Sequence, residues 1–304
     1  MKEIYVLEHF DFNSDQMSRL KALGNVHYCA GGASQYEIED AINNADAILL
    51  DWIDPDQILP KMKSGQFICL PYTGYDWIKT LNEAKKNGVV VSNTPNYSTN
   101  AVAEHHLALI LDCAKHITEF NNIYKSGEKV WFNRGLELSG KTIGIIGLGN
   151  IGRRLGSFLP AFGAKVITYN RTNKNLPNIK DVDLKTLLST SDIVCVTCKL
   201  TPETRNMIGM AELTKMKENA ILTSTTGGVI NLDDLAVFLE SNKLFGVGLD
   251  DVDQQKVPTG LLKHKNVICT YHRAYDTNES ETNRINLCID NIEAFLKHKP
   301  INVI

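Results

Sequence analysis

Three glycines at the spacing G-x-G-x-x-G are the residues of this sequence that point most directly to chemistry. They follow the apolar run TIGII and open a helical pattern, in a motif of six residues: Gly147, Leu148, Gly149, Asn150, Ile151 and Gly152. In this context the first glycine permits a tight turn, the second lets the backbone approach a diphosphate, and the third lets helix and strand pack closely. The N–H groups at the helix start bind the phosphates. We therefore predict that this motif binds a dinucleotide.

The end of the next strand indicates which dinucleotide is bound. In NAD-binding domains an acid about 20 residues after the glycines holds the ribose 2′-hydroxyl. Here the strand KVITY is followed by Asn170, Arg171 and Thr172, with no carboxylate. Arginine can pair with a 2′-phosphate, and the Asn and Thr side chains can assist it. These residues favour NADP, with NAD possible; the alternative is that Arg171 is an ordinary solvated residue.

Two cysteines three residues apart raise the question of zinc or redox chemistry. Cys195 and Cys198 lie in DIVCVTC, an apolar run typical of a buried strand, where positions three apart face opposite sides of the sheet. No second Cys/His pair at ligand spacing accompanies them, so we expect two unreactive thiols and no metal. The seven cysteines form no disulfide pattern, which suits a reducing cytoplasm.

The elements that must position these residues alternate along the chain. Short apolar runs such as EIYVLEH, FICLPY and KTIGIIGLG are separated by helical patterns, which is typical of βα units around parallel sheets. A long helical pattern begins near Thr99 and continues towards Tyr124. A chain of 304 residues is long enough for two domains. The sequence thus predicts an α/β protein with two parallel sheets.

Composition excludes several classes of partner. The net charge of -3 gives no electrostatic attraction to nucleic acid or to an anionic membrane. The start, MKEIYVLEHFDF, lacks the pattern of a signal peptide, and no apolar run approaches the roughly 18 residues of a membrane span. We expect a soluble, cytoplasmic protein that acts on a small molecule.

The sequence resembles the D-isomer-specific 2-hydroxyacid dehydrogenase family over nearly its whole length. The matching stretches are TGYDWI, NTPNYSTNAVAEHHLALIL, ELSGKTIGIIGLGNIGRRL, LTPETRNMIG and the LD of GVGLD. The resemblance implies two Rossmann-like domains, with a dinucleotide-binding domain at 99–272 inserted in a substrate domain made of 1–98 and 273–304. It implies a homodimer formed through the central domain. It also implies further cofactor contacts at Cys198, Thr204, Thr225 and Asp250.

The family's chemistry uses a histidine, a carboxylate and an arginine. The segment NVICTYHRAYDTNES aligns His272 with the histidine, and an imidazole with a pKa near 6.5 suits proton exchange with a substrate oxygen. The carboxylate position falls at Gln255, which can orient an imidazole but carries no charge. We therefore expect a lower pKa for His272 than beside a glutamate. Under a shifted alignment, Asp251 or Asp253 could substitute.

The arginine that grips the substrate carboxylate in the family is replaced here. The family pattern N-x-x-R-G-G reads T-S-T-T-G-G, which puts Thr226 at the arginine position. Threonine has no charge and a short reach, so the bidentate clamp is absent. Arg273, beside His272, could supply the charge from another direction; the alternative is a surface arginine.

Other groups for the substrate come from the loop at 71–76. In the family, backbone N–H groups of this loop hold the substrate carboxylate, a role that falls to Thr73 and Gly74. Tyr72 either faces the same site or packs inside the domain. His105 and His106, in the helix after Thr99, are expected to pack or to face solvent rather than to bind a metal.

Two functions fit these observations. The first is an NAD(P)-dependent dehydrogenase or reductase that uses His272 as acid/base on a 2-oxo or 2-hydroxy acid, on a less anionic carbonyl or on an imine. The second is a dinucleotide-binding sensor or interaction protein that has lost catalysis, since two of the three catalytic positions differ from the family.

Overall fold

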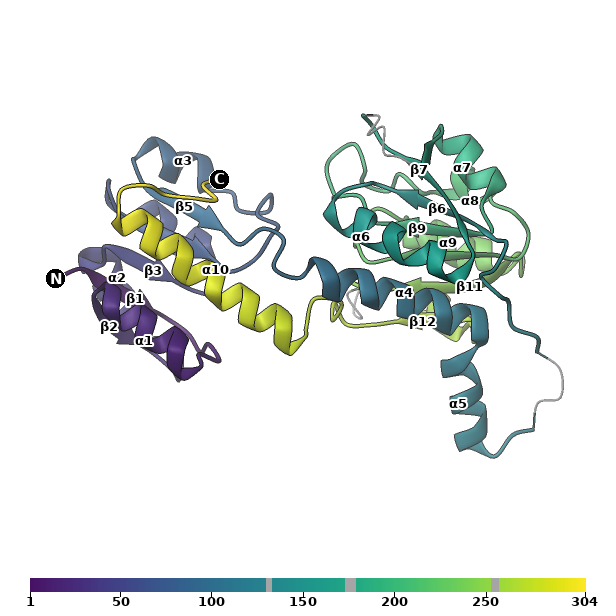
Figure 1. Ribbon diagram of the computed structural model, residues 1–304, viewed down its shortest axis with the longest axis horizontal. Coiled ribbons are helices and arrows are strands. Elements are labelled where there is room, and N and C mark those ends of the chain that lie inside the picture. Colours follow the sequence, from purple (N-terminus) through teal and green to yellow (C-terminus); the bar gives the residue numbers. More distant parts are fainter. Residues whose placement is uncertain (130–132, 173–178, 253–256) are drawn as a thin grey trace. The chain divides into compact units, whose positions relative to one another are not determined.

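The computed structural model describes residues 1–129, 133–172, 179–252 and 257–304 (Figure 1). The chain forms two compact units, Met1–Ser98 with Asp276–Ile304, and Thr99–Tyr275. The second crossing between them lies after Tyr275, a few residues beyond the predicted position after 272. Each unit is a parallel sheet covered by helices, which confirms the predicted fold class.

The first unit has a five-stranded parallel sheet of order β2-β1-β3-β4-β5. Its strands are β1 (Glu3–Val6), β2 (Asn25–Tyr28), β3 (Ala47–Leu49), β4 (Phe67–Leu70) and β5 (Val90–Asn93). Its helices are α1 (Ser14–Leu23), α2 (Gln35–Asn44), α3 (Leu81–Lys86) and α10 (Asn278–Leu296), with 3-10 turns at Pro55–Gln57 and Leu59–Lys61. Along β1, Ile4 and Val6 face one core and Tyr5 the other, as a strand with period two requires.

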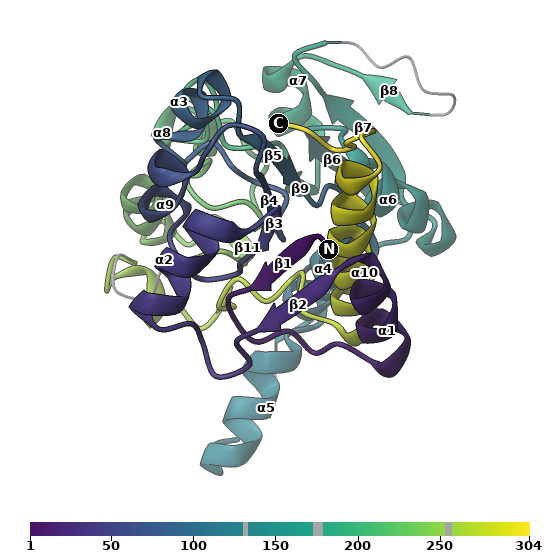
Figure 2. The ribbon, with the colours of Figure 1, turned by 90° about the vertical axis from the view of Figure 1, so that its left-hand side faces the viewer.

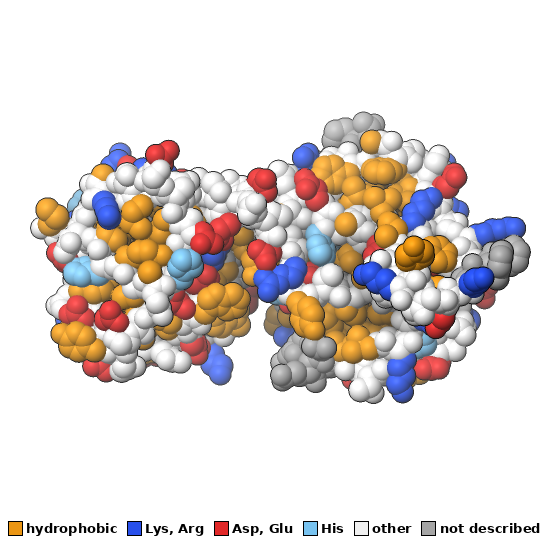
Figure 3. All heavy atoms as spheres, turned by 90° about the horizontal axis from the view of Figure 1, so that it is seen from below, with side chains coloured by type: hydrophobic (Ala, Val, Ile, Leu, Met, Phe, Trp, Pro, Cys, Tyr) orange, Lys and Arg blue, Asp and Glu red, His pale blue; other side chains and the backbone are white. Residues whose placement is uncertain are grey.

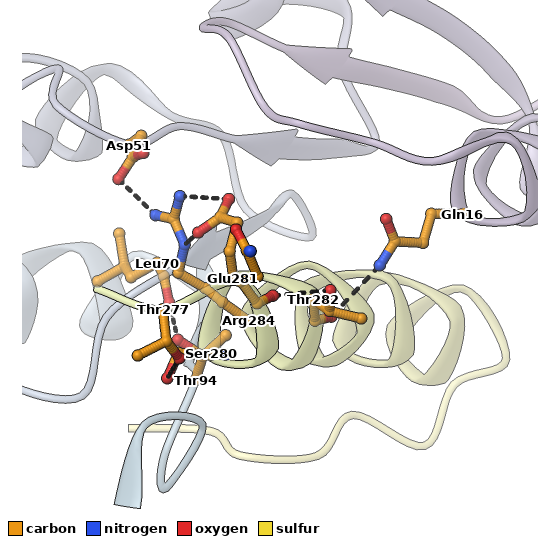
Figure 4. A network of polar contacts seen from close by, with 10 residues as sticks. Gln16, Asp51, Leu70, Thr94, Thr277, Ser280, Glu281, Thr282 and Arg284 are labelled. Atoms are coloured by element: carbon orange, nitrogen blue, oxygen red, sulfur yellow. Dashed lines mark hydrogen bonds and ion pairs between the residues drawn. The ribbon is translucent and has the colours of Figure 1, made fainter. Parts of the chain in front are cut away.

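Helices α1 and α10 lie side by side on one face of this sheet (Figure 2). The C-terminal segment is joined to the rest of the unit by a polar network (Figure 4). In this network Arg284 of α10 binds Asp51, after β3, at 2.8 Å and also binds Glu281 at 2.7 Å. Gln16 of α1 donates to the carbonyl of Thr282. These contacts make the two distant chain segments one unit.

The second unit has a seven-stranded parallel sheet of order β12-β11-β10-β9-β6-β7-β8. Its strands are β6 (Thr142–Ile146), β7 (Lys165–Tyr169), β8 (Lys180–Asp181), β9 (Ile193–Val196), β10 (Ala220–Ser224), β11 (Leu244–Leu249) and β12 (Val267–Cys269). Its helices are α4 (Thr99–Lys115), α5 (Ile117–Ser126), α6 (Asn150–Phe158), α7 (Leu184–Thr190), α8 (Met210–Leu213) and α9 (Leu232–Leu239), with 3-10 turns at Leu159–Phe162 and Leu261–Lys263. Helices α4 and α6 cover one face, and α7, α8 and α9 cover the other.

The order of this second sheet reverses between β6 and β9. From β6 the chain first adds β7 and β8 on one side, and then returns to add β9, β10, β11 and β12 on the other. In open α/β sheets, ligands bind outside the carboxyl ends of the strands at such a reversal. The glycine motif follows β6 and therefore lies at this position.

The helical pattern that begins at Thr99 forms two helices rather than one. The break is at His116, which has a left-handed backbone (φ 54°) between α4 and α5. Its ring packs on Phe245, with centroids 4.7 Å apart, and its Nδ1 lies 3.0 Å from a carboxylate oxygen of Glu119. The prediction of a continuous helix was wrong because this tertiary packing outweighs the helical pattern. In the part of the chain that the structure describes, each helix is too short or too polar to cross a membrane.

Candidate active site

The turn after β6 has the backbone that the first glycine was predicted to provide. Gly147 has a φ of 97°, a conformation that side chains other than glycine rarely adopt, and its N–H donates to the carbonyl of Tyr169 at 2.9 Å. A Cβ at this position would lie 2.5 Å from the Cα of Cys198. The turn at Gly147 thus excludes a side chain for two independent reasons.

The other two glycines also have distinct environments. A Cβ on Gly152 would collide with the carbonyl oxygen of Gly147 and lie 2.8 Å from Oγ1 of Thr197. A Cβ on Gly149 would meet nothing within 4 Å. Gly149 is also the N-cap of α6 and provides no side-chain cap, so the positive end of the helix dipole is open to an anion. This arrangement fits a diphosphate, because Gly152 packs tightly against the turn while the space beside Gly149 is open.

Asn170 supports this turn. Its side-chain oxygen accepts a hydrogen bond from the N–H of Leu148, and its amide donates to Asp181 at 3.1 Å and to Thr168 at 3.4 Å. Both the oxygen and the nitrogen of the amide are therefore hydrogen-bonded within the second unit, and Asn170 stabilises the glycine turn. This contact could not be predicted from the sequence, because Asp181 is on a different strand.

Arg171 and Thr172 follow as exposed residues. Glu203 has a lowered pKa, chiefly because the hydroxyl of Thr201 donates to it and to a smaller extent because of the positive charge of Arg171. Glu203 lies in the loop after β9. That loop also contains Thr204, whose hydroxyl donates to the carbonyl of Lys199 at 2.7 Å.

Cys195 and Cys198 lie on and just after β9. Burial raises the pKa of Cys195 to about 12 and that of Cys198 to about 11, so neither thiol ionises readily. All seven cysteines of the chain are free. Among the described residues no group of three metal-ligating side chains comes together.

His106 of α4 connects two threonines of the same sheet. It is fully buried, with Nε2 2.7 Å from Oγ1 of Thr223 and Nδ1 3.3 Å from Oγ1 of Thr225. Burial lowers its pKa to about 3, so it stays neutral. His106 packs, as expected, and it fixes Thr225 at the end of β10. His105 lies 3.1 Å from the hydroxyl of Thr270.

His272 has a carboxylate partner, and that partner is Asp251. Nδ1 of His272 lies 2.8 Å from Oδ1 of Asp251, just beyond β11. The hydrogen bond that Asp251 accepts from the imidazole, together with the charge of Asp251, raises the pKa of His272 above the usual value, although desolvation opposes the shift and 62% of the side chain is exposed. Burial would raise the pKa of Asp251, but the contacts with His272 and with the N–H of Gly227 lower it. The lower pKa expected for His272 assumed that it has no carboxylate neighbour, and the structure gives it one in Asp251; Gln255 lies outside the described residues.

Asp250 anchors the turn that carries His272. Its carboxylate is fully buried and accepts from the hydroxyl of Thr270 at 2.6 Å. It also accepts from the backbone N–H groups of Arg273 at 2.9 Å and Ala274 at 3.0 Å. The side chain that the resemblance placed near the nicotinamide thus holds both ends of the 270–274 turn. Arg273 is exposed at this turn.

Thr226 lies in the neighbouring turn, after β10. Its N–H donates to Oγ of Ser224 at 3.2 Å, and the same hydroxyl donates to the carbonyl of Thr226 at 3.0 Å. Because β10, β11 and β12 are adjacent parallel strands, their carboxyl ends bring the turns at 225–227, 250–251 and 270–274 to one edge. The structure therefore brings His272, Asp251 and Thr226 to the same edge of the sheet in the second unit.

The predicted substrate loop belongs to the first unit. Thr73 and Gly74 are exposed; the hydroxyl of Thr73 donates to the carbonyl of Thr94, and the side chain of Asn93 donates to the carbonyl of Thr73. The hydroxyl of Tyr72 is buried and has no hydrogen-bond partner among the described residues, and its ring lies 5.7 Å from that of Trp77. Burial raises the pKa of Tyr72. This environment fits the packing role that the sequence left open.

Comparison with known proteins now decides the family. Residues 107–274 match the D-isomer specific 2-hydroxyacid dehydrogenase NAD binding domain. A hydroxypyruvate reductase from Blautia hydrogenotrophica is 32% identical over 320 residues, which cover 99% of both chains. The chain belongs to the D-isomer specific 2-hydroxyacid dehydrogenase family. As a family member it is an NAD(P)-dependent oxidoreductase acting on CH–OH groups.

Two further relatives bear on what this 2-hydroxyacid dehydrogenase does. A glyoxylate reductase from Thermofilum pendens is 35% identical over 280 residues, covering 87% of this chain and 82% of the relative. The solved structure of an acyclic imino acid reductase in complex with NADPH and D-Arg is 28% identical, with a TM-score of 0.87 and 99% coverage of both chains. The names of these relatives favour an oxidoreductase over a dinucleotide-binding protein that has lost catalysis.

Proposed function

We propose that this enzyme uses NADPH to reduce the carbonyl group of a 2-oxo acid or a related compound, with His272 as the proton donor. The observation that carries the proposal is the His272–Asp251 pair at the same edge of the sheet as the glycine turn. Relatives named hydroxypyruvate reductase, glyoxylate reductase and glycerate dehydrogenase support this substrate class.

His272 is suited to both directions of the reaction. The bound cofactor supplies or accepts the hydride. Because Nδ1 pairs with Asp251, Nε2 is the nitrogen that exchanges a proton with the substrate oxygen. In reduction, imidazolium donates from Nε2 as negative charge develops on the carbonyl oxygen; in oxidation, neutral imidazole accepts the hydroxyl proton. The raised pKa keeps His272 protonated to higher pH, so reduction falls only as pH rises through that raised value.

The substrate carboxylate needs donors other than residue 226. We assign this role to Arg273, which is exposed on the turn beside His272 and carries a positive charge. Thr226 has no charge to offer, which weakens selection for a simple anionic 2-oxo acid.

A second candidate substrate is an imine formed from a 2-oxo acid and an amine. It is favoured by Thr226 in place of arginine, and by the similarity to a solved acyclic imino acid reductase. The deciding experiment is a panel of 2-oxo acids with purified protein and NADPH, with and without ammonium or methylamine, monitored at the nicotinamide absorbance. Turnover without amine supports the carbonyl reaction; turnover only with amine supports the imine; no turnover in either case contradicts the proposal.

Arg171 is proposed to select NADPH through the 2′-phosphate. Arg171→Ala should weaken NADPH binding about 10- to 100-fold, because a charge-assisted hydrogen bond contributes about 1.5–3 kcal/mol. NADH binding should stay unchanged, since NADH has no 2′-phosphate. Fluorescence titration of both cofactors measures this. Lys185→Ala removes an exposed cation from α7 and is the matched control. An equal loss of both cofactors would contradict this role of Arg171.

We also propose that the enzyme is a homodimer that uses α5. In Figure 1 this helix projects away from the sheet of its unit, and Figure 3 views the molecule from the side to which it points. None of its residues is buried, and Ile117, Phe120 and Tyr124 are exposed at helical spacing. Tyr124→Glu should shift the mass measured by light scattering from dimer to monomer. A wild-type monomer at micromolar concentration would contradict the dimer.

A further inference from the structure

We propose that Asp251 is the carboxylate that positions His272. In the family this role falls to the residue that aligns with Gln255, and glutamine has no charge with which to perform it. The inference rests on the proposed acid/base function of His272, and concerns which residue orients and charges it. Asp251 lies just after β11 and His272 just after β12, so the contact joins two neighbouring strands.

Both oxygens of the Asp251 carboxylate are used, and each has a separate partner. Oδ1 lies 2.8 Å from Nδ1 of His272, while Oδ2 accepts from the backbone N–H of Gly227 at 3.0 Å. With both oxygens engaged, the plane of the carboxylate is fixed, and so is the direction of the imidazole. Asp251 therefore connects the turn that carries His272 to the turn that contains Thr226.

The backbone around this contact is shaped for it. Asp251 has a φ of 60° and His272 a φ of 50°, so both partners adopt the left-handed conformation, which Asp and His take more readily than most residues other than glycine. Such conformations persist where the surrounding structure holds them, and they cluster at functional sites. Asp250 stabilises the backbone around His272, because its carboxylate accepts hydrogen bonds from the hydroxyl of Thr270 and from the N–H groups of Arg273 and Ala274.

Gly227 leaves room for this carboxylate. A Cβ at this position would lie 2.5 Å from the backbone oxygen of Asp251 and 2.9 Å from its Oδ2. Any side chain at 227 would therefore displace Asp251 from His272. The glycine and the carboxylate therefore form one arrangement.

The charges around His272 agree with this assignment. Asp251 and Asp250 favour the imidazolium, and Arg273 opposes it; Nε2 of His105 lies 3.9 Å from Oδ1 of Asp250. Asp250 already accepts three hydrogen bonds from the 270–274 turn. Among the described residues, Asp251 is thus the carboxylate in direct contact with the ring, and its charge stabilises the imidazolium that donates the proton.

The test compares Asp251→Asn with wild type in the full-length enzyme with NADPH. Asparagine keeps the shape but removes the charge, so kcat for reduction at neutral pH should fall, and the alkaline limb of the kcat/KM profile should move about 1 unit lower or more. NADPH affinity should stay unchanged. Asp233→Asn, on the exposed face of α9, removes one charge from the same unit and should leave the profile in place. An unchanged profile in Asp251→Asn overturns the inference.

A second measurement needs no variant. The pKa of His272 in the wild-type enzyme, followed by NMR of the ring protons, should lie above the usual value of about 6.5. A value at or below this would overturn the inference even if Asp251→Asn failed to fold. Failure of the proposed function is distinguishable: wild-type enzyme would then show no turnover with the substrate panel, while His272 could still titrate high beside Asp251.

Discussion

Replacement of His272 by glutamine is expected to lower kcat for carbonyl reduction by about 100- to 10,000-fold, the range that a positioned acid/base contributes. Glutamine keeps a hydrogen-bonding side chain at the turn but cannot give up a proton to an alkoxide. NADPH affinity should remain unchanged, because the glycine turn after β6 does not involve this residue. Steady-state kinetics and fluorescence titration of the same protein preparation separate the two effects.

A matched histidine controls for non-specific effects. His27 on β2 pairs with Glu3 at 2.6 Å, so His27→Gln also breaks a histidine–carboxylate contact, but in the first unit rather than the second. Its kcat should equal that of wild type. Full turnover in His272→Gln, with normal cofactor binding, would remove His272 from the chemistry.

The second large effect is expected at Gly152. An alanine there places a Cβ against the carbonyl oxygen of Gly147, so either α6 or the turn must move. Overpacking of this kind costs about 1–3 kcal/mol, and if the turn takes up the strain, NADPH binding weakens by about 10- to 100-fold. Calorimetric titration and thermal unfolding measure the two consequences in one protein.

Two neighbouring glycines make this experiment discriminating. Gly156 is on the same helix, but a Cβ there comes no nearer than 3.4 Å to another side chain, so Gly156→Ala should leave binding intact. A Cβ on Gly149 meets no atom of the described residues within 4 Å, so Gly149→Ala should keep its Tm and still bind NADPH less tightly, because the added carbon occupies the space for the phosphates. Equal affinities in all three variants would exclude the turn as the diphosphate site.

Local requirements explain what the sequence could predict. The backbone needs of Gly147, Gly149 and Gly152 are set within six residues, so their spacing already reveals the turn, the open position and the close packing. The alternation of apolar runs and helical patterns is equally local, and it was sufficient for the two parallel sheets.

Long-range contacts explain the rest. Asp251 was one of two alternatives in the sequence; its choice depends on β11 lying beside β12 and on left-handed backbone at both partners. The break between α4 and α5 depends on His116 packing on Phe245, more than a hundred residues away, with no glycine or proline to announce it. The role of Asn170 depends on β8 pairing with β7. None of these contacts has a local signature.

The hydrogen bonds of Asn170 limit how coenzyme preference can be re-engineered. The obvious exchange towards NADH, Asn170→Asp, would introduce an acceptor for the ribose diol. That same exchange would replace the amide that now donates to Asp181 at 3.1 Å, and would set two carboxylates against each other beneath the glycine turn. The double substitution Asn170→Asp with Asp181→Asn restores a hydrogen-bond donor between the two strands. It is therefore the better design for a change of coenzyme preference.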